Sequence, residues 1–225
     1  MALSDLLGRL AAGLNGARML ADALGIKAEH VAPIAGAGRV APAKQIQGAK
    51  LSNHMVNNID ERVALIVGLV QRGATDMDVI AKAREIVSQR CGDQWCTRPR
   101  DWKAEITAIH NAVRDKLMRY VRDPDGVDLF AHPKHSLKMK AGDCDEQCSL
   151  EGALLRAIGY PVELVVVETV NAPVKGEMEH IFLVTAYEDS AGKQHAIWLD
   201  PTVDKPAGWR VPEGLVVNER SFSVP

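Results

Sequence analysis

The 225-residue chain lacks the features that would assign it to several broad classes of protein. It has no run of about 18 uninterrupted apolar residues, so we expect a soluble protein without a membrane span. Its formal net charge is only -2, so neither nucleic acid nor an acidic membrane surface is an expected partner. No basic region precedes the mildly apolar N-terminus, which Asp5, Arg9 and Arg18 interrupt. We therefore expect no secretory signal and synthesis in a reducing, intracellular compartment.

Cysteine is also scarce, and its four residues fall in two close pairs, Cys91/Cys96 and Cys144/Cys148. A disulfide-stapled secreted scaffold would be shorter and richer in cysteine, so the thiols are expected to be free, catalytic or metal-binding. A disulfide or a metal clip between Cys91 and Cys96 is the less favoured alternative. The chain has no glycine-rich loop of the kind that cradles phosphates, and we expect no cofactor.

The N-terminal segment, residues 1–50, is expected to contain one amphipathic helix and a linker. Leucines recur there at helical spacing, and the apolar stripe that they form needs a covering surface. Residues 25–50 are rich in Gly, Ala and Pro and show little periodicity, which is typical of a linker. The helix is expected to pack either on its own domain or on another protein. The leucines are Leu3, Leu6, Leu7, Leu10 and Leu14.

The remaining residues, 51–225, read as one domain in which helices come first and strands follow. Apolar periodicity and capping residues predict helices over 58–71, 75–88, with Thr75 and Asp78 at its start, and 102–121. Runs rich in β-branched residues predict strands over 162–170, 181–187 and 196–199. This order predicts an α+β fold with an antiparallel sheet.

The stretch "GDCDEQCSLEGALLRAIGYPVE" predicts a helix that places Cys144 in its first turn. Asp143 is expected to cap the free amides while Glu146 reaches back, as in a capping box. The peptide dipoles at a helix start favour a thiolate and so lower the pKa of the thiol. The flanking carboxylates of Asp143, Asp145 and Glu146 oppose this effect, so the thiol is expected to need a base.

The stretch "HIFLVTAYEDSAGKQHAIWLD" predicts a β-hairpin that supplies this base. A turn near Ser190 and Ala191 would pair residues whose numbers sum to about 380. In that register one face is apolar and supports the Cys144 helix, while a histidine is oriented by an aspartate. The expected pairs are His180 with Asp200, Phe182 with Trp198 and Val184 with Ala196.

These elements together predict thiol chemistry on an acyl group. Cys144 would attack, His180 would carry the proton and Asp200 would fix the imidazole tautomer. The backbone amide of Cys144 is the natural first donor to the oxyanion. Tyr120 and Trp102 are the weaker candidates for a second donor.

The motifs "GDCDEQCSLEGALLRAIGYPVE", "EHIFLVTAY" and "WLDPT" resemble, in this order, the transglutaminase-like superfamily of papain-related cysteine enzymes. The preceding "RYVRDPDGVDLFAHPKHSLKMKAGDCD" is similar to versions encoded by tailed phages and prophages. The resemblance covers residues 102–203 and weakens back to about residue 58. It implies a papain-like core with Cys144, His180 and Asp200 as nucleophile, base and orienting acid. Cys148 departs from it, since an apolar residue is usual there.

The resemblance divides the domain into a helical part (58–121), a catalytic core (122–203) and a C-terminal tail (204–225). It implies a cysteine-dependent enzyme acting on amide bonds of a protein or peptide, as a peptidase or amidase or as a transamidase. Hydrolysis is favoured because water is always available. The phage setting implies the cytoplasm of a bacterial host or a virion as the location. The alternative is a non-catalytic structural or assembly protein of a phage particle, whose N-terminal segment binds a virion or tail protein.

A zinc site is a further alternative for the same region. His132, His135, Cys144 and Cys148 have the spacings H-x2-H and C-x3-C, which occur among zinc ligands. Pro133 and the acidic flanks fit a loop better than a tight zinc knuckle, so no metal is expected. The other histidines, including His110 and His195, are interpreted as surface or helix-face residues.

Overall fold

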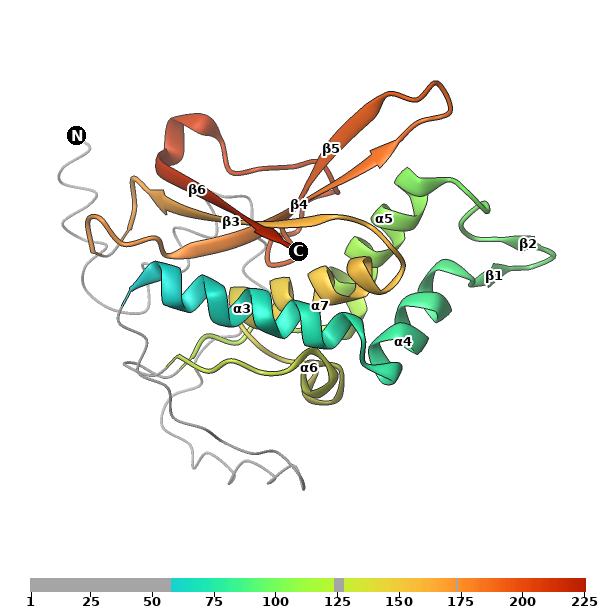
Figure 1. Cartoon of the computed structure of the whole chain (residues 1–225), viewed down its shortest axis with the longest axis horizontal. Coiled ribbons are helices and arrows are strands. Elements are labelled where there is room, and N and C mark those ends of the chain that lie inside the picture. Colours follow the sequence, from blue (N-terminus) through green and yellow to red (C-terminus); the bar gives the residue numbers. More distant parts are fainter. Residues whose placement is uncertain (1–57, 124–127, 173) are drawn as a thin grey trace.

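The computed structural model describes residues 58–123, 128–172 and 174–225. The predicted N-terminal helix and linker, and the boundary at residue 50, lie outside these residues. The described chain is an α+β domain in which helices cover one face of a four-stranded antiparallel sheet (Figure 1). The predicted fold class is therefore confirmed. Within the described residues, no helix combines the length and apolar character needed to cross a membrane.

The first two described helices match the prediction apart from their ends. Helix α3 (Ile59–Ala74) begins after Asn58, whose side chain accepts a 3.0 Å hydrogen bond from a first-turn amide. Helix α4 (Met77–Val87) begins after Asp76 rather than Thr75, because the Asp76 carboxylate is the group that caps it. Thr75 instead ends α3. Both N-caps satisfy amides that lack a partner inside the helix.

The third predicted helix is shorter than expected, and a fourth was not expected. Helix α5 (Trp102–Ala112) continues into a π-helical turn, η1 (Val113–Leu117), and ends four residues before the predicted end. The following stretch, interpreted as a loop, contains α6 (Pro133–Met139). His132 caps α6, and proline suits its first position because that amide needs no partner.

The sheet has the order β5-β4-β3-β6, and all its neighbours are antiparallel. Strands β3 (Val162–Thr169), β4 (His180–Glu188) and β5 (Gln194–Leu199) are the three predicted strands. Strand β6 (Val216–Val224) was not predicted, and it pairs with β3 along almost its whole length. A short 3-10 helix, η2 (Glu213–Leu215), leads into it. The residues interpreted as a C-terminal tail thus complete the sheet.

The predicted register of the β4–β5 hairpin is wrong by two residues. Leu183 pairs with Leu199, so paired residue numbers sum to 382 rather than 380. The turn is longer than assumed because it is closed by the Asp189 amide, which donates to the Lys193 carbonyl at 2.9 Å, and it contains Gly192 at φ 78°. A shift of two residues leaves every side chain on its original face.

The face that supports the helices is also the opposite of the predicted one. Ile181 and Leu183 of β4 pack with the helices in the main core. Phe182 and Trp198 belong to a second cluster on the other face, which Val211 helps to cover. The prediction that these two aromatic residues support the Cys144 helix is therefore wrong. The central strands β3 and β4 have buried residues on both faces, and alternation alone did not identify the face that the helix covers.

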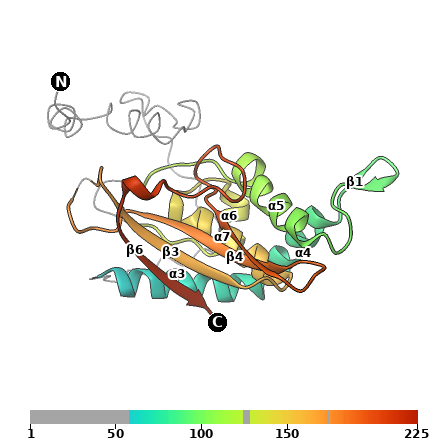
Figure 2. The same cartoon turned by 90° about the horizontal axis from the view of Figure 1, so that it is seen from above.

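Helix α7 (Cys144–Ala157) is the central helix of the domain (Figure 2). It contacts α3, α4, α5, α6, β3 and β4. All residues from Cys144 to Leu155 are buried, including the charged residues of its first turn. Gly159, at φ 97°, follows its end, as the sequence predicted. The helix start that carries Cys144 is therefore enclosed by other elements rather than exposed.

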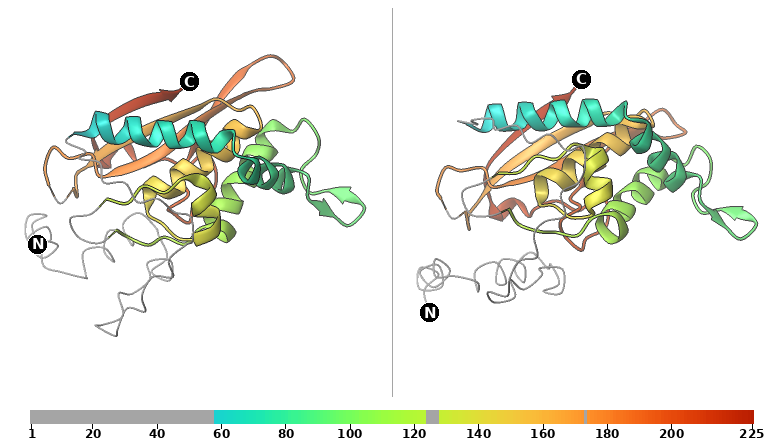
Figure 3. Two further views of the ribbon diagram at one scale, coloured as in Figure 1. Left: turned by 60° about the horizontal axis from the view of Figure 1, so that its bottom comes forward. Right: turned by 90° about the horizontal axis from the view of Figure 1, so that it is seen from below.

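A small hairpin projects from the helical side of the domain (Figure 3). Its strands are β1 (Arg90–Cys91) and β2 (Gln94–Trp95), which pair only two residues each. The tight turn brings the Cα atoms of Cys91 and Cys96 to 5.0 Å, and a disulfide joins them. The expectation of free thiols is wrong for this pair and holds for Cys144 and Cys148.

Candidate active site

Cys144 is the first residue of α7, and only 7% of its surface is exposed. The predicted capping box surrounds it: Asp143 accepts from the Asp145 amide at 2.9 Å, and Glu146 accepts from the Asp143 amide at 3.1 Å. The backbone amide of Cys144 takes part in neither of these two bonds. The positive end of the helix dipole therefore lies at the sulfur.

The Cys144 thiol has close polar neighbours. Its Sγ lies 3.7 Å from Asp145 Oδ1, and the backbone N–H of Ile181 also interacts with it. Burial, followed by the charges of Asp145 and Asp143, raises the pKa of the thiol well above its usual range. Arg62 and the Ile181 amide act in the opposite direction. The resting group is therefore a thiol at neutral pH, and it needs a base to react.

His180 and Asp200 form the pair that the sequence predicted. His180 Nε2 lies 2.7 Å from Asp200 Oδ2, and Thr202 donates to the other carboxylate oxygen from its amide and its hydroxyl, at 3.1 and 2.6 Å. Burial disfavours both charged forms. The mutual attraction and the hydrogen bond outweigh it, so the pKa of Asp200 is lowered and that of His180 is raised. Since Nε2 faces Asp200, Nδ1 is the nitrogen left for a third partner.

The start of β4 connects this pair to α7. Ile181 follows His180, its N–H interacts with Cys144, and its carbonyl accepts from Cys148 Sγ at 3.2 Å. The charge of Asp145 acts on His180, and that of Asp200 acts on Cys148. The start of α7 and the His180–Asp200 pair thus lie at one end of the sheet. A hydrogen bond between Cys144 Sγ and His180 remains a prediction.

The acidic residues beside Cys144 carry less charge than the sequence suggests. Burial and the nearby Asp143 charge raise the pKa of Glu146 to about 8. Burial and the Asp145 charge raise the pKa of Asp143 to about 6. Glu146 and Asp143 are hydrogen-bonded to each other when one proton is present. The two carboxyl groups therefore hold one proton between them near neutral pH.

The zinc site proposed as an alternative is not assembled. Among the described residues, the ligand atoms that lie within 4.8 Å of one another form two groups. His132 and His135 are in neither group, and His132 Nδ1 instead accepts from the Lys134 amide at 3.2 Å. The Sγ of Cys148 donates a hydrogen bond to the Ile181 carbonyl. The groups that offer ligand atoms to a cation are Asp143–Cys144–Asp145 and Asp123–Asp143–Glu146.

Arg62 is the residue of this region that sequence reasoning missed. Its Nε and Nη2 atoms donate to Asp145 Oδ2 at 3.1 and 2.9 Å, and Nη1 lies 3.6 Å from Asp128 Oδ2. Arg62 and Asp145 are 83 residues apart. An arginine among the charged residues of an amphipathic helix has no local signal that distinguishes it from a solvated side chain.

The two weaker candidates for an oxyanion donor have different positions. Tyr120 forms a β-bridge with Gly142, two residues before Cys144. Burial, and then the charges of Cys144 and Asp143, raise the pKa of Tyr120, so its hydroxyl keeps the proton that a donor needs. Trp102 is not at this site: its carbonyl lies 3.4 Å from the hydroxyl of Tyr160, beyond the other end of α7 and about 20 Å along the helix from Cys144.

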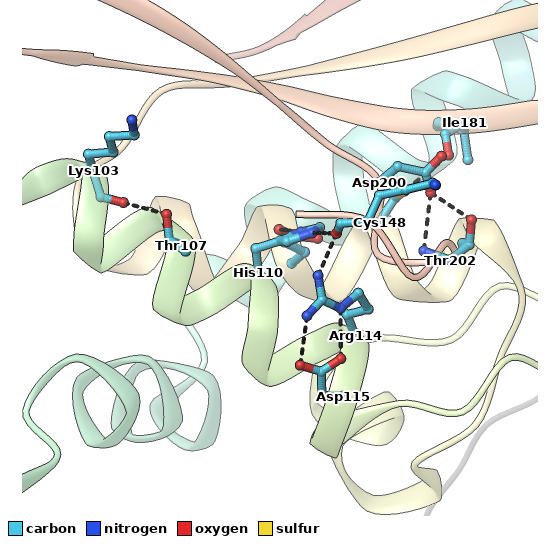
Figure 4. Close-up of polar contacts among 11 residues, drawn as sticks. Lys103, Thr107, His110, Arg114, Asp115, Cys148, Ile181, Asp200 and Thr202 are labelled. Carbon is cyan, nitrogen blue, oxygen red and sulfur yellow. Dashed lines mark hydrogen bonds and ion pairs between the residues drawn. The ribbon is translucent and has the colours of Figure 1, made fainter. Parts of the chain in front are cut away.

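A buried polar network lies further along α7 on the face that carries Cys144 and Cys148. His110 Nδ1 lies 3.0 Å from Glu151 Oε1, and Nε2 lies 3.2 Å from the Lys205 carbonyl (Figure 4). Arg114 donates to the same carbonyl. His110 lies on α5 and is fully buried, so of its two interpretations, surface or helix-face residue, the first is wrong. The network ties the loop after Asp200 to both α5 and α7.

Comparison with known proteins identifies the family to which most of this domain belongs. Residues 73–200, more than half of the chain, match the model of the transglutaminase-like superfamily. No curated protein matches the chain. A solved structure described as a "putative protease" from Parabacteroides distasonis ATCC 8503 is similar at 14% identity and a TM-score of 0.45. The match covers 72% of this chain and 29% of that one, so the chain spans less than a third of that protein's length.

Proposed function

Because the chain belongs to the transglutaminase-like superfamily, we propose that it is a cysteine-dependent acyl-transfer enzyme that acts on amide bonds of a peptide or protein. The observation that carries this proposal is the His180–Asp200 pair, half-buried at His180 and buried at Asp200, joined at 2.7 Å at the end of the sheet where Cys144 begins α7. Asp200 holds the imidazole in the tautomer with hydrogen on Nε2. Nδ1 then has the free lone pair that takes a proton from Cys144.

The proposed first step joins Cys144 to the acyl group of the substrate. The thiol proton passes to His180 Nδ1 while Sγ attacks the amide carbon, and a C–S bond forms. The tetrahedral intermediate then breaks its C–N bond, and His180 returns the proton to the leaving amine. In the second step, water or an amine attacks the thioester, the C–S bond breaks, and Cys144 regains a proton.

The oxyanion of the intermediate needs donors aimed at its position. The first is the amide of Cys144, which the capping box leaves without a role. The second is the hydroxyl of Tyr120, which is held near the helix start by the bridge between Tyr120 and Gly142. A Tyr120→Phe variant is expected to lower the rate at which Cys144 is acylated, while Cys144 remains the residue that is modified. Equal rates for wild type and variant would remove Tyr120 from the mechanism.

The rival hypothesis is a protein that keeps this fold without turnover, as a structural or assembly component. The observation that favours it is the resting state of Cys144, whose thiol is buried against Asp145 and whose pKa is raised. In the enzymatic hypothesis, His180 overcomes this barrier by taking the proton during attack. The two hypotheses therefore differ in whether the reactivity of Cys144 depends on His180.

Alkylation by iodoacetamide at neutral pH tests this difference, with the modified residue identified by mass spectrometry. Cys148 is the internal comparison, since it is free and buried in the same helix. We expect Cys144 to react faster than Cys148 and His180→Ala to slow Cys144 at least tenfold. His195→Ala is the matched control, because His195 forms a 2.7 Å pair with Asp189 at the far end of the same hairpin. Equal labelling of the two cysteines, or no effect of His180→Ala, would favour the structural role.

Other parts of the hypothesis concern the setting of the protein. The phage or prophage origin, a substrate in a virion or host cell wall, and binding of a virion or tail protein by the N-terminal segment remain predictions. The same holds for the division into residues 1–50, 58–121, 122–203 and 204–225. The Cys91–Cys96 disulfide favours an oxidising location over the reducing cytoplasm, because disulfides are rare in reducing compartments.

A further inference from the structure

We propose that Arg62 is a positioning residue for Cys144: it holds the Asp145 carboxylate by one oxygen and balances its charge, so that the neighbouring thiol can lose its proton. The proposal rests on the role of Cys144 as the nucleophile. It concerns a residue of α3 that precedes residues 73–200, the part of the chain that matches the superfamily. The supporting element is therefore additional to the matched core.

The two carboxylate oxygens of Asp145 have different partners. Both donors of Arg62, Nε and Nη2, point to Oδ2 at 3.1 and 2.9 Å. The other oxygen, Oδ1, is the one that lies 3.7 Å from Cys144 Sγ. The Asp145 side chain is 5% exposed and that of Arg62 is 26% exposed. Without Arg62, a buried carboxylate next to the sulfur would have no cation to offset its charge.

Arg62 is itself held in place by contacts outside α7. Its Nη1 lies 3.6 Å from Asp128, and its guanidinium lies 5.9 Å from the ring centre of Phe130. It also lines a small cavity together with Asp145, His180 and Ile181. The same side chain thus contacts the residue after the nucleophile and faces the residue proposed as its base.

The charged groups around Cys144 predict whether loss of Arg62 or of the Asp145 charge favours or disfavours the thiolate. Asp143 and Asp145 face the thiol from its own helix, and Tyr120 adds a neutral hydroxyl from the preceding segment. The His180–Asp200 pair lies on the sheet side, with His180 Nε2 2.7 Å from Asp200 Oδ2. Arg62, from α3, is a permanent cation that acts on the thiol and favours its charged form. Its removal therefore disfavours the thiolate, and removal of the Asp145 charge favours it.

The test measures the pH dependence of Cys144 alkylation by iodoacetamide in the full-length chain, with mass spectrometry to separate Cys144 from Cys148. Arg62→Ala is expected to move the profile about one pH unit upward and to slow labelling about tenfold at neutral pH. Asp145→Asn is expected to move the profile downward. Arg62→Lys keeps the charge but loses the fork of two donors, so it should restore part of the rate.

Arg220→Ala is the matched control for loss of an ion pair on α3. Arg220, from β6, pairs with Asp60, two residues before Arg62 on α3. We expect it to leave the Cys144 profile unchanged, and melting temperatures of all variants measure any loss of folding. The purely structural role of Arg62 predicts that Arg62→Ala and Asp145→Asn change labelling in the same direction or not at all, and that result would overturn the proposal.

Failure of this inference is distinguishable from failure of the proposed function. If Cys144 of the wild type reacts no faster than Cys148, the nucleophile itself is wrong and Arg62 has no role to support. If Cys144 is selectively reactive and depends on His180, but Arg62→Ala and Arg62→Lys both keep the wild-type profile, only the role of Arg62 is wrong. Opposite shifts of the pH profile of Cys144 alkylation in Arg62→Ala and Asp145→Asn support both the proposed function and the role of Arg62.

Discussion

At the scale of single residues, the Asp143–Glu146 pair links the cap of α7 to the pH dependence of stability. Glu146 has a pKa of about 8 in the folded chain, above its ordinary value of 4.5. Between these values the folded state holds a proton that the unfolded state has released. Its contribution to stability is therefore complete below pH 4.5 and is lost as the pH rises through about 8.

A Glu146→Gln variant should show a smaller loss of stability between pH 5 and pH 8 than the wild type, because the amide stays neutral throughout. The amide can donate to Asp143, as the protonated Glu146 does, but it keeps only one acceptor for the two backbone amides that Glu146 serves. Urea unfolding at both pH values measures the effect. Glu177→Gln, which removes one exposed carboxylate, is the control. A fall in stability as steep as that of the wild type would contradict the shared proton.

The buried His110–Glu151 pair provides a second prediction for a single residue. Burial alone lowers the pKa of His110, but the charge of Glu151 and its hydrogen bond outweigh burial and raise it. Glu151→Gln removes that charge and should lower the pKa of His110, as measured by NMR of the imidazole. The stability that the pair adds below pH 6.5 and loses as the pH rises through the raised pKa should disappear in the variant. An unchanged His110 titration would contradict this account.

Residues with local signals could be predicted from the sequence, and residues with distant partners could not. The cap formed by Asp143 and Glu146 depends on neighbours within one helical turn, so a short motif was sufficient to find it. Arg62 acts on Asp145 across 83 residues, and the burial of His110 depends on the packing of α5 against α7. Both are properties of tertiary structure that a single sequence does not express.

At the scale of elements, the hairpin shows why a wrong register still led to the right pair of residues. The predicted pairing was displaced by two residues because the turn from Asp189 to Lys193 is longer than assumed. Side chains repeat with a period of two along a strand, so His180 and Asp200 stayed on one face and are diagonal neighbours rather than opposite ones. A displacement of one residue would have separated them.

Two elements were missed for different reasons. Helix α6 spans only seven residues and starts with a proline, so it has too few turns to show a periodic apolar stripe. Strand β6 is an edge strand with mostly exposed residues, and its charged side chains hide the alternation that marks a buried strand. Both elements depend on tertiary contacts, since α6 packs against α7 and β6 pairs with β3.

The close packing of α3 against α6 and α7 makes Gly73 a sensitive position. A Cβ atom added there would lie 2.5 Å from Pro133 Cγ and 2.9 Å from Ala153 Cβ. Alanine normally favours a helix over glycine, but here overpacking should outweigh that gain, so Gly73→Ala should lower the free energy of unfolding by about 1–3 kcal/mol. Gly214→Ala is the control, since nothing lies within 4 Å of its added Cβ. Urea unfolding measures both, and a stabilised Gly73→Ala would show that α3 can move away.

At the scale of the whole molecule, the site is formed where three layers meet. Helix α7 lies between the sheet and the other helices, and its N-terminus reaches the end of the sheet that carries His180 and Asp200. Helix α3 lies along α7 (Figure 1) and adds Arg62, which pairs with Asp145. Buried acidic residues at a helix start are tolerated because each is capped, paired or protonated.

The disulfide hairpin is separate from this core, and that separation gives a prediction for the whole molecule. Its strands are exposed and pair with each other, and it projects away from the sheet and α7 (Figure 3). A disulfide stabilises a protein mainly by restricting its unfolded chain, typically by about 2–4 kcal/mol when the closed loop belongs to the cooperative core. The loop between Cys91 and Cys96 is short and its strands are exposed, so we expect it to open locally and its disulfide to contribute less to global unfolding.

The double variant Cys91→Ser/Cys96→Ser should therefore melt within about 3 °C of the wild type, a shift that corresponds to less than about 1 kcal/mol for a domain of this size. The hairpin should open locally, so trypsin should cleave the variant after Arg90 faster than it cleaves the oxidised wild type. Wild-type protein with its disulfide reduced is the control and should behave as the variant does. Cys144 should be alkylated in the variant at the same rate as in the oxidised wild type. A loss of several degrees together with slower Cys144 labelling would show that the hairpin supports the core, because local opening cannot lower the stability of elements that it does not contact.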